Sequence, residues 1–288
     1  MSLAFSDPRH LVPLARAAEE AGFFGVSLSD HVVHPERIRT AYPYTPDGAP
    51  RWNDETPWPD PLVAIGALGT ATERIRFLTQ VFVLPLRNPL LAAKAISTAD
   101  VLCGGRLLLG IGVGWMREEF ELAGQPFPGR GRRCDEMVEV LRKLFTGEMV
   151  EHRGEFYRFD RLRMLPRPVG EVPLLVGGLS DPALRRAARV GDGWLSDLHT
   201  TEELRSICAR LHALRREYGR EDRPFHVVGA AIDAAGPDGY RRLRDAGVTH
   251  VLTMPWVFYG GMTESLEKKC DGIRRFGEEV ISRLRQEA

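Results

Sequence analysis

Two adjacent residues, Asp30 and His31, carry side chains suited to acid–base chemistry. They follow an apolar run at residues 24–28, whose length is typical of a buried strand. Histidine exchanges protons near neutral pH, and a neighbouring carboxylate can orient it or stabilise its charge. The dipeptide alone is equally compatible with a turn that the aspartate caps. Its place at a strand end is what favours catalysis.

A glycine-rich stretch, Gly-Ile-Gly-Val-Gly-Trp, occupies residues 110–115 at the end of another apolar run. Because glycine lacks a Cβ atom, we expect the backbone near Gly112 to approach a planar ligand closely, although relief of crowding would also explain the glycines. A dinucleotide fingerprint is disfavoured, since that motif follows the first strand and needs an acidic residue after the second.

The stretch Val-Gly-Gly-Leu-Ser-Asp-Pro at residues 176–182 joins a third apolar run to an expected helix. Backbone N–H groups at a helix start bind phosphate well. Asp181 before Pro182 also fits an ordinary helix cap, and the two interpretations are compatible. The residues that would hold the phosphate are Gly177, Gly178, Leu179 and Ser180.

Polar residues elsewhere add to the candidate site. Thr79 and Gln80 could point out of the strand expected at residues 75–83. A basic cluster begins the helix expected at residues 132–145, where it is either solvated or binds an anion. Its members are Arg130, Arg132 and Arg133.

Strand-length and helix-length segments alternate along the whole sequence, which predicts a (β/α)₈ TIM barrel in a single domain, residues 1–288. A doubly wound sheet of this length usually has fewer strands. We expect strands at residues 3–5, 24–28, 75–83, 107–111, 172–176, 193–196, 225–229 and 248–252. We expect helices at residues 8–21, 61–70, 89–102, 132–145 and 263–285, and others starting near residues 181, 201 and 237.

Two longer connections interrupt this pattern. The loop after the second strand, residues 31–60, is rich in proline and aromatic residues, and we expect it to act as a lid over the mouth of the barrel. Residues 148–168 precede the fifth strand and resemble a β-hairpin, to which we assign no chemistry. The aromatic residues expected to contact a substrate are Tyr42, Trp52, Trp58 and, from the glycine-rich stretch, Trp115.

Composition excludes several classes of function. Lys plus Arg equals Asp plus Glu, at 39 each, and scattered basic residues do not predict nucleic-acid binding. The four cysteines lie far apart, which argues against a metal site or disulfides. A signal peptide or membrane span is not predicted either. We therefore expect a cytoplasmic protein that acts on a small molecule.

Six stretches resemble, in order, motifs of the luciferase-like monooxygenase superfamily, and within it the coenzyme F420-dependent oxidoreductases of actinobacteria. The resemblance covers almost the whole chain. The stretches are Ala-Ala-Glu-Glu-Ala-Gly-Phe at 17–23, Leu-Ser-Asp-His-Val-Val at 28–33, Thr-Glu-Arg-Ile-Arg at 72–76, Asp-Val-Leu-Cys-Gly-Gly-Arg at 100–106, Leu-Gly-Ile-Gly-Val-Gly-Trp-Met-Arg-Glu-Glu-Phe at 109–120 and Arg-Val-Gly-Asp-Gly-Trp at 189–194.

This resemblance implies roles for the residues already singled out. His31 would lie near the reactive centre of a deazaflavin ring, with Asp30 beside it. A non-proline cis peptide between Gln80 and Val81 would form a bulge behind the ring. The resemblance also implies that Thr79 and Gly112 surround the ring and that the loop containing Gly177, Gly178 and Leu179 holds the cofactor phosphate.

The implied reaction is hydride transfer between reduced F420 and an unidentified small organic substrate, with His31 donating a proton or stabilising charge. Basic residues for the anionic F420 tail have no matched position, so an FMN-dependent monooxygenase supplied by a separate reductase is an alternative. A non-catalytic flavin-binding protein is another, and a metal-dependent hydrolase lacks its usual histidine pair. The superfamily also suggests a homodimer.

Overall fold

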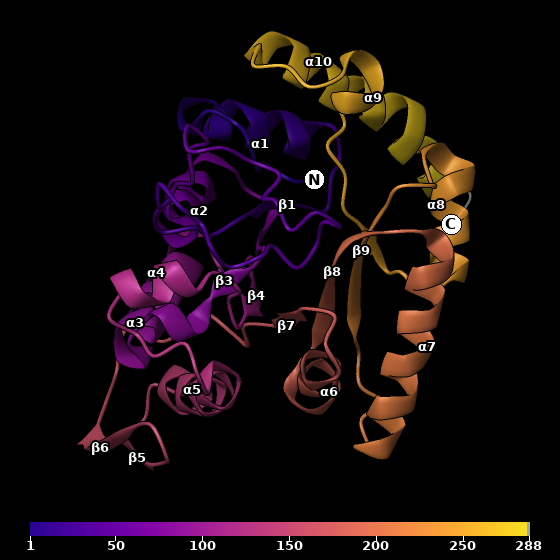
Figure 1. Cartoon of the computed structure of the whole chain (residues 1–288). Coiled ribbons are helices and arrows are strands. Elements are labelled where there is room, and N and C mark those ends of the chain that lie inside the picture. Colours follow the sequence, from indigo (N-terminus) through magenta and orange to yellow (C-terminus); the bar gives the residue numbers. More distant parts are fainter. Residues whose placement is uncertain (287–288) are drawn as a thin grey trace.

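Strands and helices alternate in the computed structural model, which describes residues 1–286, and Figure 1 shows the strands at the centre with helices outside them. An eight-stranded parallel sheet runs in the order β1-β2-β4-β7-β8-β9-β10, with β3 beside β4. This confirms the predicted TIM-barrel class. The strands are β1 (Gly25–Leu28), β2 (Arg76–Thr79), β3 (Phe82–Val83), β4 (Leu107–Gly112), β7 (Leu174–Gly177), β8 (Gly193–His199), β9 (His226–Ala231) and β10 (His250–Val251).

The helices begin where capping residues stand in the sequence. Asp60 and Asn88 accept backbone N–H groups at the starts of α2 and α3, and Thr200 forms a capping box with Glu203 at α7. The helices are η1 (Pro8–His10), α1 (Leu11–Glu20), α2 (Pro61–Ala71), η2 (Leu84–Leu86), α3 (Pro89–Leu102), α4 (Arg117–Leu122), α5 (Arg130–Phe145), α6 (Asp181–Val190), α7 (Thr201–Glu217), α8 (Gly236–Asp245), α9 (Val257–Gly260), α10 (Leu266–Phe276), η3 (Gly277–Ile281) and α11 (Ser282–Gln286).

The first strand differs from its prediction. Instead of a strand at residues 3–5, a single bridge joins Ser2 to Ser27, and Phe5 turns away with φ of 62°. The N–H of Ser2 also donates to the carbonyl of Thr253 at 2.9 Å. This segment therefore closes the ring between β1 and β10 with backbone hydrogen bonds rather than with a full strand.

The strand predicted at residues 75–83 is wrong as one element, because it divides into β2 and β3. The peptide between Gln80 and Val81 at the break is cis, as the resemblance implied. The Thr79 side chain, just before the break, donates its hydroxyl to the carbonyl of Gly110 at 2.8 Å. The break leaves Gln80 and Val81 outside the parallel ladder and at the end of the barrel.

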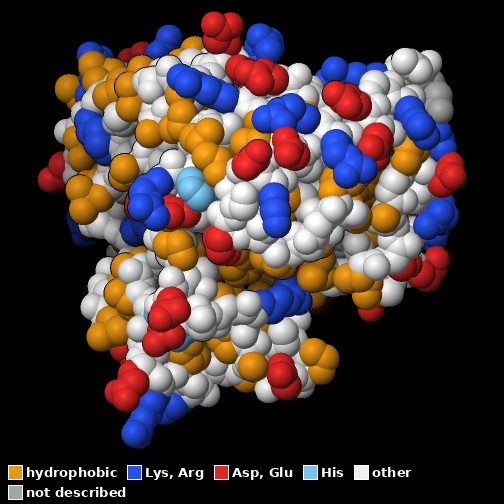
Figure 2. Space-filling model, turned by 90° about the horizontal axis from the view of Figure 1, so that it is seen from above, with side chains coloured by type: hydrophobic (Ala, Val, Ile, Leu, Met, Phe, Trp, Pro, Cys, Tyr) orange, Lys and Arg blue, Asp and Glu red, His pale blue; other side chains and the backbone are white. Residues whose placement is uncertain are grey.

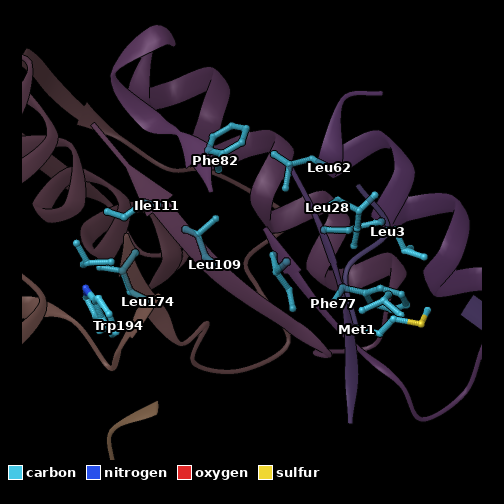
Figure 3. Close-up of a cluster of buried hydrophobic side chains, with 14 of the residues drawn as sticks. Met1, Leu3, Leu28, Leu62, Phe77, Phe82, Leu109, Ile111, Leu174 and Trp194 are labelled. Carbon is cyan, nitrogen blue, oxygen red and sulfur yellow. The ribbon is translucent and has the colours of Figure 1, made fainter. Parts of the chain in front are cut away.

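Side chains along each strand alternate between two cores. One set packs against the outer helices, and Figure 3 shows Phe77, Leu109 and Leu174 within it. The intervening residues fill the barrel itself, where four buried side chains form a layer across it. These are Leu108, Leu175, Leu195 and Val228. This layer closes the interior of the barrel below the cavity at its mouth, and Leu195 of the layer lines that cavity.

The predicted hairpin is confirmed as β5 (Val150–Arg153) paired with β6 (Arg158–Leu162). Glu136 on α5 fastens it, because this carboxylate accepts the N–H groups of Phe156 and Tyr157. Within residues 1–286, no helix is long and apolar enough to cross a membrane. Figure 2 shows acidic and basic side chains interspersed over one face.

A histidine at the amino-terminal end of β10 gives the fold a pH dependence. Burial, reinforced by the nearby His226, lowers the pKa of His250 to about 4 from its usual 6.5. Between pH 6.5 and 4 the unfolded chain binds a proton that the native site refuses, so stability should fall as pH falls through this window. Urea unfolding at pH 7.5 and pH 5 measures the loss of stability. His250→Gln should reduce the difference in the free energy of unfolding between the two pH values, and an unchanged difference would show that His250 is not its source.

Candidate active site at the mouth of the barrel

A cavity of about 900 Å³ opens at the carboxyl ends of the strands. This is the face where enzymes of this architecture place their sites. The cavity brings together every predicted site residue except Thr79, which is fully buried and makes its hydrogen bond below the cavity wall. The residues gathered there are Asp30, His31, Tyr42, Trp52, Trp58, Gln80, Val81, Gly112, Trp115, Gly177, Gly178, Leu179 and Ser180.

The Asp30 carboxylate is held in an ion pair. Arg87 donates to both of its oxygens, at 2.6 and 2.8 Å, and the N–H of Val83 donates at 2.8 Å. Asp30 is 4% exposed. Because both oxygens accept hydrogen bonds, this carboxylate fixes the end of β1 against β3. The sequence offered no sign that Arg87 is its partner.

The His31 ring is oriented by a carboxylate on α4. Its Nδ1 lies 3.3 Å from Oε2 of Glu119, whose other oxygen accepts the N–H of Val32 at 2.7 Å. The side chains of His31 and Glu119 are only 12% and 3% exposed. A ring nitrogen held in this way leaves Nε2 as the nitrogen that can serve a ligand.

The neighbouring Glu118 fastens the start of the aromatic loop. It accepts the N–H of Arg39 at 2.8 Å and both the N–H and the hydroxyl of Thr40. Burial would raise the pKa of Glu118, but these donors hold it below its usual value. Helix α4 was not predicted, because its six residues are too few for a helical period to be recognised.

Three indole rings surround His31. The ring centroids of Trp52, Trp58 and Trp115 lie 4.6, 5.3 and 6.4 Å from that of the imidazole. Tyr42 packs edge-on against Trp52 and Trp115. Burial and the nearby Asp197 raise the pKa of the Tyr42 phenol, which therefore stays neutral. The environment around His31 is thus aromatic and largely shielded from water.

A salt bridge holds the aromatic loop across the mouth. Arg51 donates to both oxygens of Asp197 at the end of β8, at 2.7 and 2.9 Å, and to the carbonyl of Tyr44. Arg51 and Asp197 lie 146 positions apart in the sequence. The loop therefore reaches from the end of β1 to the opposite side of the barrel, which is the arrangement expected of a lid.

Removing this salt bridge should loosen the lid. With Arg51→Ala, acrylamide should quench the tryptophan fluorescence more efficiently, because a partly exposed bidentate pair stabilises the closed loop by roughly 1 kcal/mol, which is about fivefold in the ratio of closed to open loop. Arg153→Ala is the control, since Arg153 pairs with Asp160 on the distant hairpin. Equal quenching in both variants would show that Arg51 does not hold the loop.

Two glycines at the strand ends relieve crowding, which is one of the two explanations that the sequence offered for the glycine-rich stretch. A Cβ atom on Gly112 would lie 2.4 Å from Cγ2 of Val81, and one on Gly177 would lie 2.6 Å from Cγ1 of the same residue. Gly112 itself also lines the cavity, so its place beside a ligand stays a prediction. The two glycines make room for Val81, and Val81 in turn forms the surface that the cavity presents.

Polar groups suited to a cofactor lie on this side of the cavity. Oε1 of Gln80 is buried and has no hydrogen-bond partner among residues 1–286. Ser180, rather than Asp181, caps α6, and its side chain forms no capping bond within the described chain. Ala183 already donates its N–H to the carbonyl of Ser180, and Pro182 has no N–H, so the N–H groups of Ser180 and Asp181 are the ones available to an anion at this helix start. Asp181 pairs instead with Arg185 and Arg210.

The three arginines near the start of α5 have different environments. Arg130 lines the cavity, donating to the carbonyl of Gly114 at 2.9 Å. Burial lowers its pKa, with Arg117 and Arg133 adding to the effect. Arg132 pairs with Glu155 on the hairpin, and Arg133 donates to backbone carbonyls. Only Arg130 of the three is placed to meet an anionic ligand.

The architecture and site define an α/β-barrel enzyme, with titratable side chains gathered where the strands end. The chain belongs to the luciferase-like monooxygenase family, which matches residues 2–265, and it is an oxidoreductase of that family. Among residues 1–286, His, Cys, Asp and Glu side chains do not form a group of three that could hold a metal ion.

Relatives support this placement. An uncharacterised protein of Mycobacterium tuberculosis is 40% identical over 284 residues, 98% of each chain. An F420-dependent glucose-6-phosphate dehydrogenase of Nakamurella multipartita is 35% identical over 195 residues, 66% of this chain and 52% of that enzyme.

Solved structures share the fold. The coenzyme F420-dependent tetrahydromethanopterin reductase of Methanopyrus kandleri has a TM-score of 0.75 at 17% identity, covering 99% of this chain and 98% of that one. The oxygenating constituent of 3,6-diketocamphane monooxygenase from Pseudomonas putida, in complex with FMN, has a TM-score of 0.63 at 18% identity, covering 80% and 65%.

Proposed function

We propose that this protein is an F420-dependent oxidoreductase that transfers a hydride between reduced deazaflavin and a small organic substrate. The observation that carries the proposal is His31, held by Glu119 and enclosed by three indoles in the wall of a large cavity. The F420-dependent relative at 35% identity supports F420 over FMN, because the FMN-bound structure shares only the fold.

The residues present fit such a cofactor. Val81, seated in the space left by Gly112 and Gly177, offers an apolar surface for a ring, and the unpartnered Oε1 of Gln80 can accept a hydrogen bond. The start of α6 and Arg130 suit a phosphate. When bound, reduced F420 supplies the hydride.

The side chains of this protein would supply the rest. Nε2 of His31 would donate a proton to the substrate atom that gains the electron pair, while Glu119 stabilises the charge on the ring. Asp30 would act as a positioning residue through Arg87 and Val83. The aromatic loop, held by Arg51, would exclude water from the reacting atoms.

An FMN-dependent monooxygenase with a partner reductase is the second candidate, and oxygen separates the two. The protein should be assayed with one panel of neutral ketones and aldehydes under two conditions. One assay contains reduced F420 without oxygen, and the other contains reduced FMN with oxygen. The proposal expects oxidation of F420 that depends on the carbonyl compound and does not consume oxygen. Oxygen uptake that depends on both FMN and the panel would favour the monooxygenase, and binding without either reaction would favour a non-catalytic protein.

We also propose that the single-domain chain forms a homodimer. Helices α2 and α3 pack together, with Leu102 against Gly66, yet they leave apolar side chains outside. Val63 and Leu91 are 75% and 72% exposed. Burying such a face would favour self-association. Light scattering should give twice the mass of the chain, and Val63→Asp should shift it toward the monomer. A monomeric wild type would contradict this proposal.

A further inference from the structure

An apolar wall borders the cavity on the side of α9. It consists of Met254, Val257, Phe258 and Met262, all of which line the cavity. Val257, Phe258 and Met262 are 40, 50 and 60% exposed. Exposed apolar side chains gathered at a cavity mark a surface that a ligand covers, and methionines adapt to ligands of irregular shape.

The α9 wall lines the same cavity as His31 and is linked to it through the N-terminal segment. The segment after β10 bonds to the N-terminal segment through Ser2 and Thr253. Phe5 belongs to the N-terminal segment, and its ring centroid lies 5.4 Å from that of Trp58. The Trp58 ring centroid in turn lies 5.3 Å from that of His31. The groups suited to a cofactor follow β2, β4 and β7, on the other side of β1 in the ring of strands.

Charged groups near His31 are already neutralised. Asp30 pairs with Arg87, Arg51 pairs with Asp197, and His31 itself faces Glu119. Of the arginines that line the cavity, Arg51 is paired and Arg130 is assigned to the cofactor phosphate, so a phosphate or carboxylate on the substrate would meet no further unpaired arginine among the described residues. A sugar phosphate, the substrate named for the Nakamurella relative, would be poorly served here.

We propose that the α9 wall binds the body of the substrate, and that the substrate is a neutral molecule with an extended apolar part. This inference rests on the proposed function, because it takes His31 to mark the reacting atoms. An apolar body would bury against Met254, Val257, Phe258 and Met262 while the reacting end lies among the indoles. Affinity should then rise with the apolar length of the ligand.

Primary alcohols from 1-butanol to 1-octanol are suitable probes. Their binding can be measured through tryptophan fluorescence, with and without oxidised F420. The dissociation constant should fall about two- to fourfold for each added methylene. Octanoate, which carries a charge, should bind at least about tenfold more weakly than 1-octanol. A series without dependence on length, or tighter binding of glucose 6-phosphate than of 1-octanol, would overturn the inference.

Charged substitutions test whether the dependence of affinity on chain length arises at the α9 wall. Val257→Glu and Met262→Glu should each flatten the dependence on chain length, and both positions are exposed enough to keep the fold. Ile232→Glu is the matched control, because Ile232 is 68% exposed and stands outside the cavity lining. Equal loss in all three variants would overturn the inference. Retained length dependence without any F420 oxidation by the carbonyl panel would contradict the proposed function and leave the α9 wall as an apolar site.

Discussion

Replacing His31 by alanine should lower the rate of hydride transfer from reduced F420 by about 10²- to 10⁴-fold, which is the usual contribution of one acid–base group. The imidazole ring of His31 lies beside Glu119 and three indoles in the cavity wall, so the substitution removes the proposed proton donor from this wall. Cofactor affinity should change little, because the groups suited to the cofactor lie after β2, β4 and β7.

Stopped-flow measurement of F420 oxidation, with the best carbonyl compound of the panel, gives the rate, and a fluorescence titration gives the affinity. His212→Ala is the control, because His212 lies exposed on α7. Turnover in the His31 variant equal to that of the control would remove His31 from the mechanism. An equal loss of rate and cofactor affinity would instead give it a binding role.

Gly112→Ala should destabilise the protein by about 2 kcal/mol and weaken cofactor binding at least about tenfold. The added Cβ would meet Cγ2 of Val81 at 2.4 Å, so Val81 must move out of its place in the cavity wall. Urea unfolding measures the first effect and fluorescence titration the second. Gly170→Ala is the control, because a Cβ there meets nothing within 4 Å among the described residues.

Removing the clashing methyl groups provides the decisive comparison. In the Gly112→Ala, Val81→Ala double variant, the closest remaining approach is to Cβ of Val81 at 3.4 Å, which is ordinary contact. The double variant should be more stable than the sum of the single effects predicts, by at least about 1 kcal/mol. Additive effects would mean that Gly112 is required for a reason other than the volume of Val81.

Local signals predicted the fold well. The helix predicted at residues 89–102 has the same bounds as α3, whose start is marked by proline after asparagine, and the alternation around Gly154 predicted the hairpin. The strand predicted at residues 3–5 is only a bridge in the structure, and the strand predicted at residues 75–83 is divided, both for the same physical reason. Both are set by backbone pairing across the barrel, through Ser2 and Gln80, and short apolar segments do not reveal such pairing.

The candidate site was predicted as a set of positions, without the contacts that organise it. Strand ends identified His31 and Gln80 because the carboxyl ends of parallel strands share one face. Their partners could not be found this way. Arg87 lies 57 positions from Asp30, and Glu119 lies 88 positions from His31. An acidic residue soon after a glycine-rich strand was the available signal for Glu119, which lies on α4.

If the mouth of this barrel is a deazaflavin site, equilibrium binding of the two cofactors shows it most directly. Oxidised F420 and FMN should be titrated separately into the purified protein while the fluorescence of the cavity tryptophans is followed. We predict that F420 binds at micromolar concentration and FMN at least tenfold more weakly, about 1.4 kcal/mol or more. FMN binding as tightly as F420, or no response to F420, would contradict the account.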